Sequence, residues 1–212
     1  MAQRFDNSVL EETFQKCNET SILDIRVSPY LARTKRPLVR LVALLGCIVL
    51  LPLMVVLTIL IRVTSKGPAF YSQTRLGQYG RKFKIYKFRS MRIDAENGKA
   101  VWCGENDPRI TRVGYYLRKL HLDEIPQLFN VALGQMDFVG PRPERPEFVT
   151  RLVEEITEYP VRMMVRPGIT GLAQVNLAPD QSVDCVRKKV VVDAEYIENA
   201  TFVMDLKIVL AT

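Results

Sequence analysis

The longest apolar run of the chain lies in its first third. Residues 41–61, LVALLGCIVLLPLMVVLTILI, contain no charged side chain. As a straight helix, these 21 residues would measure about 31 Å, close to the ~30 Å hydrocarbon core of a bilayer. The run is longer, and starts later, than the apolar core of a cleavable signal peptide. The pattern therefore predicts a helix that anchors the protein in a membrane.

Two features bear on the path of this helix. Pro52 lies near its middle, where a proline removes a backbone donor and favours a kink or a break. Basic residues flank the run on both sides: Lys35, Arg36, Arg40, Arg62 and Lys66. Positive charge at both ends favours a re-entrant helix that returns to its starting face, with Pro52 at the apex. A proline-kinked transmembrane helix is about equally consistent with these residues taken alone.

The segments on either side of the membrane run are more polar. Residues 1–34 have only weak apolar patterning, and we interpret them as a lead-in to the membrane helix. After a turn at 65–68, alternating positions over 69–73 and 83–88 predict a β-hairpin closed by a glycine-containing turn.

The second half of the chain predicts helices separated by loops. Asp107 and Pro108 have the character of an N-cap and a first helical residue, and helical spacing continues through Leu117. Glycines and prolines then predict loops on both sides of a helix at 147–159. From residue 183 onward the chain is amphipathic and helix-prone. The pattern as a whole predicts an α+β chain that is mostly helical.

Composition and charge narrow the class of protein. With 48% hydrophobic and 25% charged residues, the 212-residue chain is neither a disordered tail nor wholly embedded in a membrane. The net charge of +7 is concentrated in residues 62–92, where nine side chains are basic and none is acidic. Because this block follows the membrane helix, contact with anionic lipid is its simplest interpretation. Binding of a phosphorylated substrate or of nucleic acid stays open.

The cysteines and the single histidine, His121, limit other chemistry. Cys17, Cys47, Cys103 and Cys185 are widely spaced and form no C-x-x-C motif. This spacing argues against a disulfide framework and against a zinc site. Metals with oxygen ligands stay possible, because carboxylates are plentiful.

Asp123 and Glu124 form an adjacent pair of carboxylates, with Arg118 one turn earlier. Basic neighbours keep a carboxylate ionised, as a nucleophile or a metal ligand must be. The more ordinary interpretation of such a pair is an exposed helix face with charge pairing.

Three basic residues are further candidates. Arg142 lies between two prolines in a Gly-Pro-Arg-Pro loop, whose stiff backbone favours presentation of the guanidinium to a phosphate. Lys87 and Arg89 share one face of the second predicted strand by period-two alternation, where they could bind substrate. An exposed arginine in a structural turn, and lipid contact by the basic strand, are the alternatives.

Four stretches of the chain form a specific ordered set. They are TSKGPAFYSQTRLGQYGRKFKIYKFRSM, NDPRITRVGYYLRKLHLDEIPQLFNVALGQMDFVGPRPERPEFV, RPGITGLAQVN and DLKIVL. With these stretches, the chain resembles the bacterial sugar transferases. The resemblance extends from about residue 36 to the last residue of the chain. These are small monotopic phosphoglycosyl transferases that load a sugar-1-phosphate onto a polyprenyl phosphate.

The resemblance implies a fold and a location. It implies an α+β, mostly helical, monotopic membrane protein with a re-entrant helix broken at Pro52, a small β-hairpin and interfacial amphipathic helices. For this chain, the implied parts are a polar lead-in at 1–34, a re-entrant membrane helix at 35–64 and a catalytic domain at 65–212. The catalytic domain is expected on the cytoplasmic face of the bacterial inner membrane.

The resemblance also implies roles for individual residues. Asp123 is expected to attack the nucleotide-sugar diphosphate and to coordinate Mg²⁺, with Glu124 as its partner in a dyad. Arg142 is expected near the nucleotide phosphates, and Arg118 near the lipid phosphate. Cations are needed at such a site, because two unit charges about 4 Å apart interact by ~4 kcal/mol at an effective dielectric of about 20.

We therefore expect an enzyme that moves a sugar-1-phosphate from a nucleoside diphosphate sugar, most simply a UDP-sugar, to polyprenyl (undecaprenyl) phosphate. Nucleoside monophosphate would leave, and assembly of a surface glycan such as exopolysaccharide, O-antigen or capsule would begin. A non-catalytic membrane scaffold with the same fold is the alternative. The apolar run disfavours a nucleic-acid binder. Membrane lipids are expected partners, and the sequence leaves homo-oligomerisation open.

Three positions depart from the family pattern. The lead-in motif K-R-x-x-D lacks its aspartate, because Val39 stands there. Leu51 replaces the usual serine before the apex proline, and Leu172 replaces the usual tryptophan after P-G-I-T-G. The first two bear on membrane placement, and the third bears on local packing or substrate choice.

Overall fold

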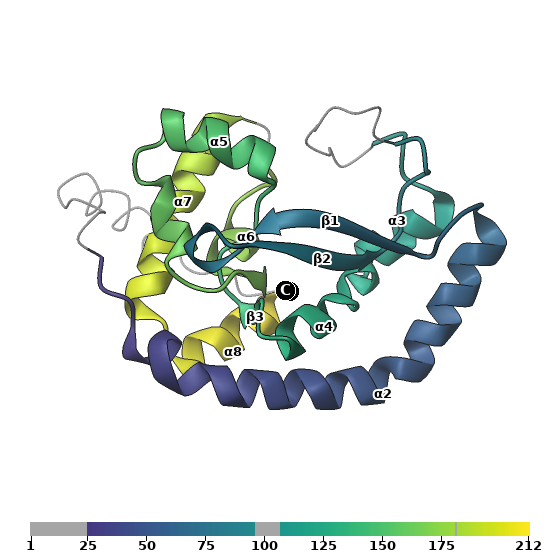
Figure 1. Cartoon of the computed structure of the whole chain (residues 1–212), viewed down its shortest axis with the longest axis horizontal. Coiled ribbons are helices and arrows are strands. Elements are labelled where there is room, and N and C mark those ends of the chain that lie inside the picture. Colours follow the sequence, from purple (N-terminus) through teal and green to yellow (C-terminus); the bar gives the residue numbers. More distant parts are fainter. Residues whose placement is uncertain (1–24, 96–106, 181) are drawn as a thin grey trace.

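The computed structural model describes residues 25–95, 107–180 and 182–212 (Figure 1). Most of the predicted lead-in therefore lies outside the described residues. One long curved helix passes beneath and along one end of a body of short helices and two small sheets. The helices are α2 (Lys35–Thr64), α3 (Arg112–Lys119), α4 (Gln127–Ala132), α5 (Pro146–Glu155), α6 (Leu172–Asn176), α7 (Val183–Asn199) and α8 (Phe202–Ala211). The strands are β1 (Phe70–Leu76), β2 (Lys82–Phe88), β3 (Asp137–Val139) and β4 (Gly168–Thr170).

Helix α2 contains the predicted membrane run. In the described part of the chain it is the one helix long and apolar enough to cross a membrane. Most of its large apolar side chains are exposed, including Leu41, Ile48, Val49 and Val56. Such a surface needs an apolar environment, as expected for a membrane-associated segment.

The expected division of this helix into two arms is absent. Helix α2 is continuous over 30 residues with Pro52 inside it, and it bends rather than breaks (Figure 1). A proline removes one donor and crowds one turn, whereas the hydrogen bonds on either side can persist. The re-entrant path stays a prediction.

The predicted hairpin is confirmed. Strands β1 and β2 pair antiparallel from Phe70↔Phe88 to Leu76↔Lys82. The turn between them contains Tyr79 and Gly80 with φ of 56° and 70°, a left-handed conformation that glycine adopts without strain. The alternation of apolar side chains gave the correct strands because one face of β2 packs on α2 and α4.

Both halves of α2 pack against the body. Val39 and Ala43, near its start, are buried with Phe83 and Ile85 of the hairpin. Toward its end, three residues are buried with Phe88 of the hairpin and Leu117 of α3; they are Met54, Leu57 and Ile61. The exposed apolar face of α2 therefore points away from a body that holds the helix at both ends.

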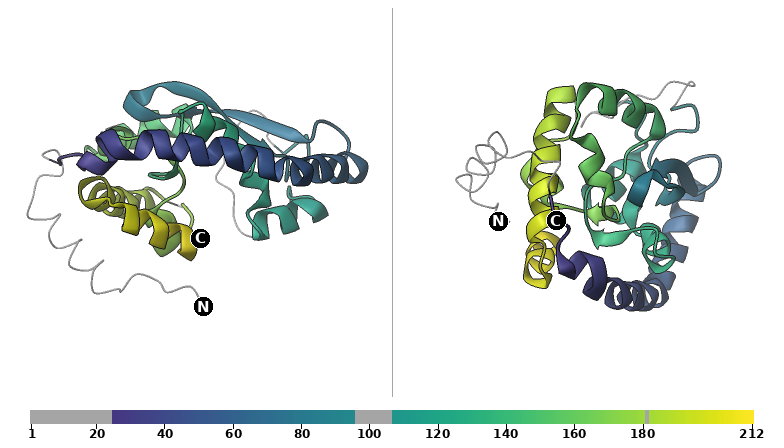
Figure 2. Two further views of the ribbon diagram at one scale, coloured as in Figure 1. Left: turned by 90° about the horizontal axis from the view of Figure 1, so that it is seen from below. Right: turned by 60° about the vertical axis from the view of Figure 1, so that its left-hand side comes forward.

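The largest core lies around the second sheet. Strands β3 and β4 pair in parallel, with Asp137 opposite Gly168 and Val139 opposite Thr170. Val139 and Leu172 belong to a buried cluster that also contains apolar side chains of α7 and α8. The leucine at the position of the expected tryptophan thus serves local packing. Figure 2 shows α7 and α8 along one side of the body, with α8 next to the start of α2.

The predicted start of the helix after residue 106 is wrong. Helix α3 begins at Arg112, and Thr111 is its N-cap, with an Oγ1 that accepts a hydrogen bond of 2.9 Å from the Gly114 amide. The Asp107 carboxylate instead accepts from Arg109 at 2.8 Å. A turn closed by the Ile110 amide and the Asp107 carbonyl, and a bridge between Met91 and Ile110, precede the helix, which starts only after them.

Other helices are shorter than predicted. Helix α3 ends where His121 adopts a left-handed φ of 53°. Helix α5 ends at Glu155, and a separate 3₁₀ turn follows at Tyr159–Met163. The C-terminal segment is two helices, because Thr201 caps a new start after Ala200 leaves the helical conformation.

Candidate active site

Asp123 and Glu124 lie on a 3₁₀ turn, Leu122–Glu124, between α3 and α4. The left-handed residue His121 reverses the chain after α3, and its carbonyl accepts the Glu124 amide at 3.2 Å. Pro126 then precedes α4 as its N-cap. The two carboxylates are therefore held by backbone geometry between two helices, and they are not on the exposed face of a regular helix.

Glu124 joins two cations from distant parts of the chain. Its Oε1 accepts from Lys87 Nζ of β2 at 2.6 Å and from Arg142 Nη2 at 3.2 Å. Burial would raise the pKa of Glu124, but the charges of Lys87 and Arg142 outweigh it and hold this pKa well below its usual range. Glu124 is therefore an anion that fixes two cations beside Asp123.

Asp123 is 7% exposed, and its carboxylate has no hydrogen-bond or ion-pair partner among the described residues. Burial raises the pKa of this carboxyl, and the negative charge of Glu124 adds to the rise. Lys87, Arg118 and Arg142 act in the opposite direction through their positive charges. A bound cation would favour the ionised form further, because it stabilises the anion where water is excluded.

The Gly140–Pro143 loop, which carries Arg142, is fixed through its carbonyl groups. The Pro141 carbonyl accepts from the Gly168 amide at 3.0 Å, and the Arg142 carbonyl accepts from Arg162 Nη2 at 3.4 Å. The Pro143 carbonyl accepts from Arg75 Nη1 at 3.1 Å. Prolines have no amide proton to donate, so these carbonyl contacts hold the loop together with the Gly140 amide, which donates to the Thr170 carbonyl at 2.9 Å.

Close backbone packing explains the glycines around this loop. A Cβ added to Gly168 would lie 2.1 Å from the Gly140 amide nitrogen, and one added to Gly171 would lie 2.3 Å from the Gly140 carbonyl oxygen. Only glycine permits this approach of the two segments. The G-P-R-P and P-G-I-T-G motifs are therefore two sides of one rigid unit.

Arg142 itself remains accessible. Its side chain is 38% exposed although its guanidinium contacts Glu124. Glu124 raises the pKa of Arg142, which keeps the guanidinium charged. A stiff backbone with a partly exposed, charged side chain suits the binding of an anionic ligand.

The other predicted cations are placed differently. Arg118 lies in the last turn of α3, and its charge acts on Asp123. Arg89 follows β2, is 7% exposed, and donates from Nη2 to the Ser65 carbonyl at 3.0 Å and to the Ser65 hydroxyl at 2.6 Å. The structure therefore brings Lys87, Arg118 and Arg142 to the dyad, whereas the contacts of Arg89 tie the hairpin to the end of α2.

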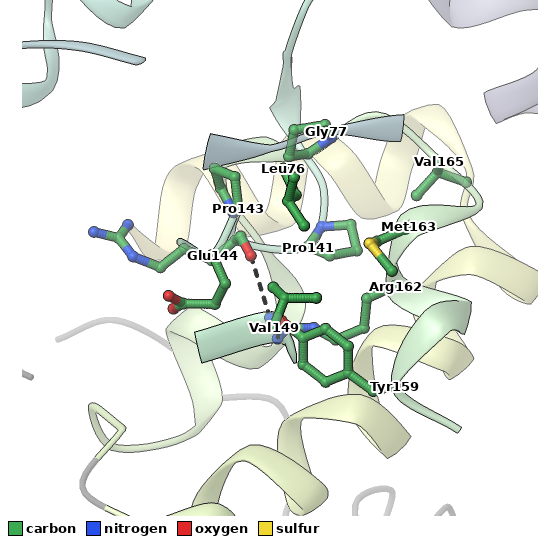
Figure 3. A pocket seen from close by; sticks show the side chains of 12 residues that line it. Leu76, Gly77, Pro141, Pro143, Glu144, Val149, Tyr159, Arg162, Met163 and Val165 are labelled. Atoms are coloured by element: carbon green, nitrogen blue, oxygen red, sulfur yellow. Dashed lines mark hydrogen bonds between the residues drawn. The ribbon is translucent and has the colours of Figure 1, made fainter. Parts of the chain in front are cut away.

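A small pocket lies behind the Arg142 loop (Figure 3). Pro141, Pro143 and Glu144 form one wall, while Val149 and Tyr159 come from α5 and the following turn. Arg162 also lines the pocket, and its Nε donates to Asp193 Oδ2 of α7 at 2.7 Å. Sequence analysis missed this buried pair, because nothing local indicates that Arg162 and Asp193 meet.

The described residues contain no cluster of three or more histidine, cysteine, aspartate or glutamate side chains suited to a metal ion. The candidate ligand is Asp123, whose oxygens have no other partner in the described part of the chain. Mg²⁺ binds hard oxygens, often through one or two carboxylates together with substrate phosphates and water. The residues present fit that pattern with Asp123 as the protein ligand.

Comparison with known proteins identifies the family. The bacterial sugar transferase family model matches residues 30–212, which is most of the chain. The protein belongs to this family. Its Asp123, Glu124 and Arg142 thus form the candidate active site of a bacterial sugar transferase.

Three relatives illustrate the similarity. The UDP-N-acetylgalactosamine-undecaprenyl-phosphate N-acetylgalactosaminephosphotransferase of Aeromonas hydrophila is 40% identical over 92% of this chain and 46% of its own length. The UDP-glucose:undecaprenyl-phosphate glucose-1-phosphate transferase of Escherichia coli is 35% identical over 98% of this chain and 46% of its own length. The exopolysaccharide production protein PSS of Rhizobium leguminosarum is 40% identical over 80% of this chain and 88% of its own length. The chain thus spans about half the length of the first two relatives.

Proposed function

We propose that the protein transfers a sugar-1-phosphate from a UDP-sugar to undecaprenyl phosphate and releases UMP. The observation that carries the proposal is the single Glu124 oxygen that holds Lys87 and Arg142 beside the buried Asp123. The names of the relatives supply the acceptor and the kind of group transferred.

The transfer takes place in two balanced steps. A carboxylate oxygen of Asp123 forms a bond to the phosphorus that carries the sugar, and the bond from that phosphorus to the oxygen of the nucleoside phosphate breaks. UMP leaves with the bonding electron pair. An oxygen of undecaprenyl phosphate then attacks the same phosphorus, which forms the lipid diphosphate sugar and returns Asp123 as a carboxylate.

The cations reduce the repulsion between Asp123 and the diphosphate. Arg142 contacts the diphosphate with a planar guanidinium whose backbone is already fixed, so little entropy is lost on binding. Lys87 contacts the same oxygen of Glu124 and adds positive charge close to Asp123. Arg118 is assigned to the lipid phosphate. We leave Arg89 out of the substrate contacts, because its described contacts are with Ser65.

The resident metal is proposed to be Mg²⁺, held by Asp123. When bound, it would offset phosphate charge and orient the diphosphate oxygens. Glu124 stays with Lys87 and Arg142, and its role is to hold these two cations in place.

The enzyme is proposed to act at the cytoplasmic face of the bacterial inner membrane. The exposed apolar face of α2 enters the bilayer. Exposed apolar side chains of α4, of the residue that follows it and of α8 lie at the interface; these are Phe129, Leu133, Phe202, Leu206 and Leu210. A lipid-linked acceptor could then reach the dyad without leaving the membrane. The product would begin a surface glycan such as exopolysaccharide, O-antigen or capsule.

The test is a screen of UDP-sugars for UMP release by the purified full chain, with undecaprenyl phosphate and Mg²⁺ in detergent or nanodiscs. We expect at least one sugar to give UMP in amounts equal to the lipid diphosphate sugar formed. Asp123→Asn protein is the matched control. If no UDP-sugar or other nucleoside diphosphate sugar gives monophosphate, the scaffold alternative is favoured.

A further inference from the structure

Lys35, the first residue of α2, is buried although it carries a charge. It is 1% exposed, and its Nζ lies 2.7 Å from the Val139 carbonyl oxygen, 2.8 Å from the Tyr196 hydroxyl and 2.8 Å from Asp205 Oδ2. An ammonium has three protons to donate, so all of them have partners. A buried charge this completely paired fixes the geometry of the groups around it.

The partners of Lys35 are themselves held. Asp205 Oδ1 accepts from the Tyr196 hydroxyl at 2.6 Å, and Oδ2 also accepts from the Tyr30 hydroxyl at 2.9 Å. Burial raises the pKa values of Tyr30 and Tyr196, and the charge of Asp205 adds to the rise. Both tyrosines therefore remain donors. The cluster joins the segment before α2 to α7 and α8.

One member of this cluster leads directly to the candidate active site. Val139 is the last residue of β3, and the Gly140–Pro143 loop with Arg142 follows it immediately. The carbonyls of Pro141, Arg142 and Pro143 are held by the body of the protein, through Gly168, Arg162 and Arg75. The Val139 carbonyl accepts from Lys35, the first residue of the membrane helix, at 2.7 Å, and the Tyr196 hydroxyl is a second, longer contact at 3.2 Å.

We propose that Lys35, at the start of the membrane helix, is a positioning residue. It fixes the position of the Gly140–Pro143 loop and, through this loop, the position of Arg142. The proposal rests on the proposed function, in which Arg142 binds the diphosphate. Lys35 does not touch substrate. It acts by fixing the Val139 carbonyl, after which the rigid loop begins. A small displacement of this carbonyl therefore moves the Arg142 guanidinium.

The first test measures the loop without measuring activity. Lys35→Met alone leaves Asp205 as an unpaired buried anion and could fail to fold, so the main variant is Lys35→Met combined with Asp205→Asn. Amide hydrogen exchange of this pair variant in nanodiscs should rise in peptides containing Gly140 and Gly168, and should stay unchanged in the β1–β2 hairpin. Arg109→Met, which breaks the ion pair with Asp107 away from the loop, is the matched control and should leave Gly140 and Gly168 protected. Unchanged exchange at the loop, or a uniform rise over the whole chain, would overturn the proposal.

The second test asks whether Lys35 acts through Arg142. The pair variant should lower kcat/KM for the UDP-sugar by about ten- to a hundredfold, because small misplacements of a binding group cost that much. When the same pair of changes is added to the Arg142→Ala variant, kcat/KM should fall by less than a further threefold, because the guanidinium that Lys35 positions is absent. An equal loss in both backgrounds would show a merely structural role and contradict the proposal. If the unmodified enzyme has no activity with any donor, the proposed function fails, and hydrogen exchange still decides the role of Lys35.

Discussion

Arg142 and Glu124, 18 residues apart in the chain, are joined by a salt bridge of 3.2 Å between Nη2 and Oε1. Arg142 lies on a rigid loop, and Glu124 lies on a turn that is fixed between two helices. The pair therefore holds the guanidinium plane in one orientation next to Asp123. This orientation, more than the charge, distinguishes Arg142 from a surface arginine.

Arg142→Lys should weaken catalysis although the charge is retained. A lysine ammonium cannot contact Glu124 and two phosphate oxygens with one planar group, so kcat/KM for the UDP-sugar should fall about tenfold or more. Arg151→Lys, which changes an exposed arginine paired with Glu155, is the matched control and should have no effect. Equal kinetics for the two variants would show that only diffuse positive charge matters at position 142.

Asp123→Asn should remove turnover while the fold stays intact. An amide oxygen is a poor nucleophile, and loss of a covalent nucleophile costs at least about a thousandfold in kcat. The measurement is UMP release, with circular dichroism to check the fold and mass spectrometry to detect the sugar-phosphate adduct on the unmodified enzyme. Asp94→Asn, at an exposed position, is the control. An adduct on a residue other than Asp123, or near-normal turnover by Asp123→Asn, would disprove the assignment.

Removal of divalent cations should stop the reaction reversibly. Chelation with EDTA is expected to abolish UMP release, and added Mg²⁺ should restore it, because diphosphate charge must be offset as the bond transfers. Thermal stability provides a second measurement, since Mg²⁺ should raise the melting temperature of the unmodified protein but not that of Asp123→Asn. Full activity in EDTA would show that the lysine and arginine side chains suffice.

The parts of the fold that follow from local pattern were predictable. The hairpin was correct because apolar alternation and the glycine turn are both local signals. The predicted start of α3 was wrong because Asp107 and Thr111 are both good N-caps. The bridge between Met91 and Ile110, which the local sequence does not indicate, favours Thr111.

The candidate site shows the same division between local and distant information. Asp123, Glu124 and Arg142 were found from their motifs, yet their convergence with Lys87 depends on tertiary packing. Arg162 and Lys35 were not singled out as contacts of the Arg142 loop, because their partners Asp193 and Asp205 lie far along the chain. Whether a charged side chain is buried depends on the folded chain, and it leaves no periodic pattern in the amino-acid sequence.

Arg162→Met should destabilise the protein strongly. Arg162 and Asp193 are almost fully buried, and removal of one partner leaves an uncompensated charge, which costs about 3–5 kcal/mol in the free energy of unfolding. Arg151→Met, which breaks the exposed pair with Glu155, should cost less than about 1 kcal/mol. Urea unfolding in detergent, followed by circular dichroism, compares the two. Similar midpoints for both variants would show that the buried pair contributes no more than a surface one.

The path of α2 through the membrane can be argued from its two ends. A straight helix of 30 residues would be about 45 Å long, so a membrane-spanning α2 would place its ends on opposite faces. Here Lys35 at one end pairs with Asp205, and Ser65 after the other end accepts from Arg89. Both partners belong to one polar body, which cannot lie on both sides of a bilayer. These contacts support the prediction that α2 enters the membrane and returns to the same face.

Cysteine accessibility tests this prediction. In a variant without the four native cysteines, single cysteines at Arg26 and Asp94, both exposed, should react with an impermeant maleimide from the same side of sealed inner-membrane vesicles. Pro52→Ala restores the missing backbone donor and removes the crowding that bends α2, so a fraction of molecules should adopt a true span and separate the two sites. Leu53→Ala is the matched control, because it changes the neighbouring residue without adding a donor, and it should leave both sites on one face. Opposite accessibility of the two sites with Pro52 in place would show that α2 spans the membrane, and the contacts of Lys35 and Arg89 could not then both form.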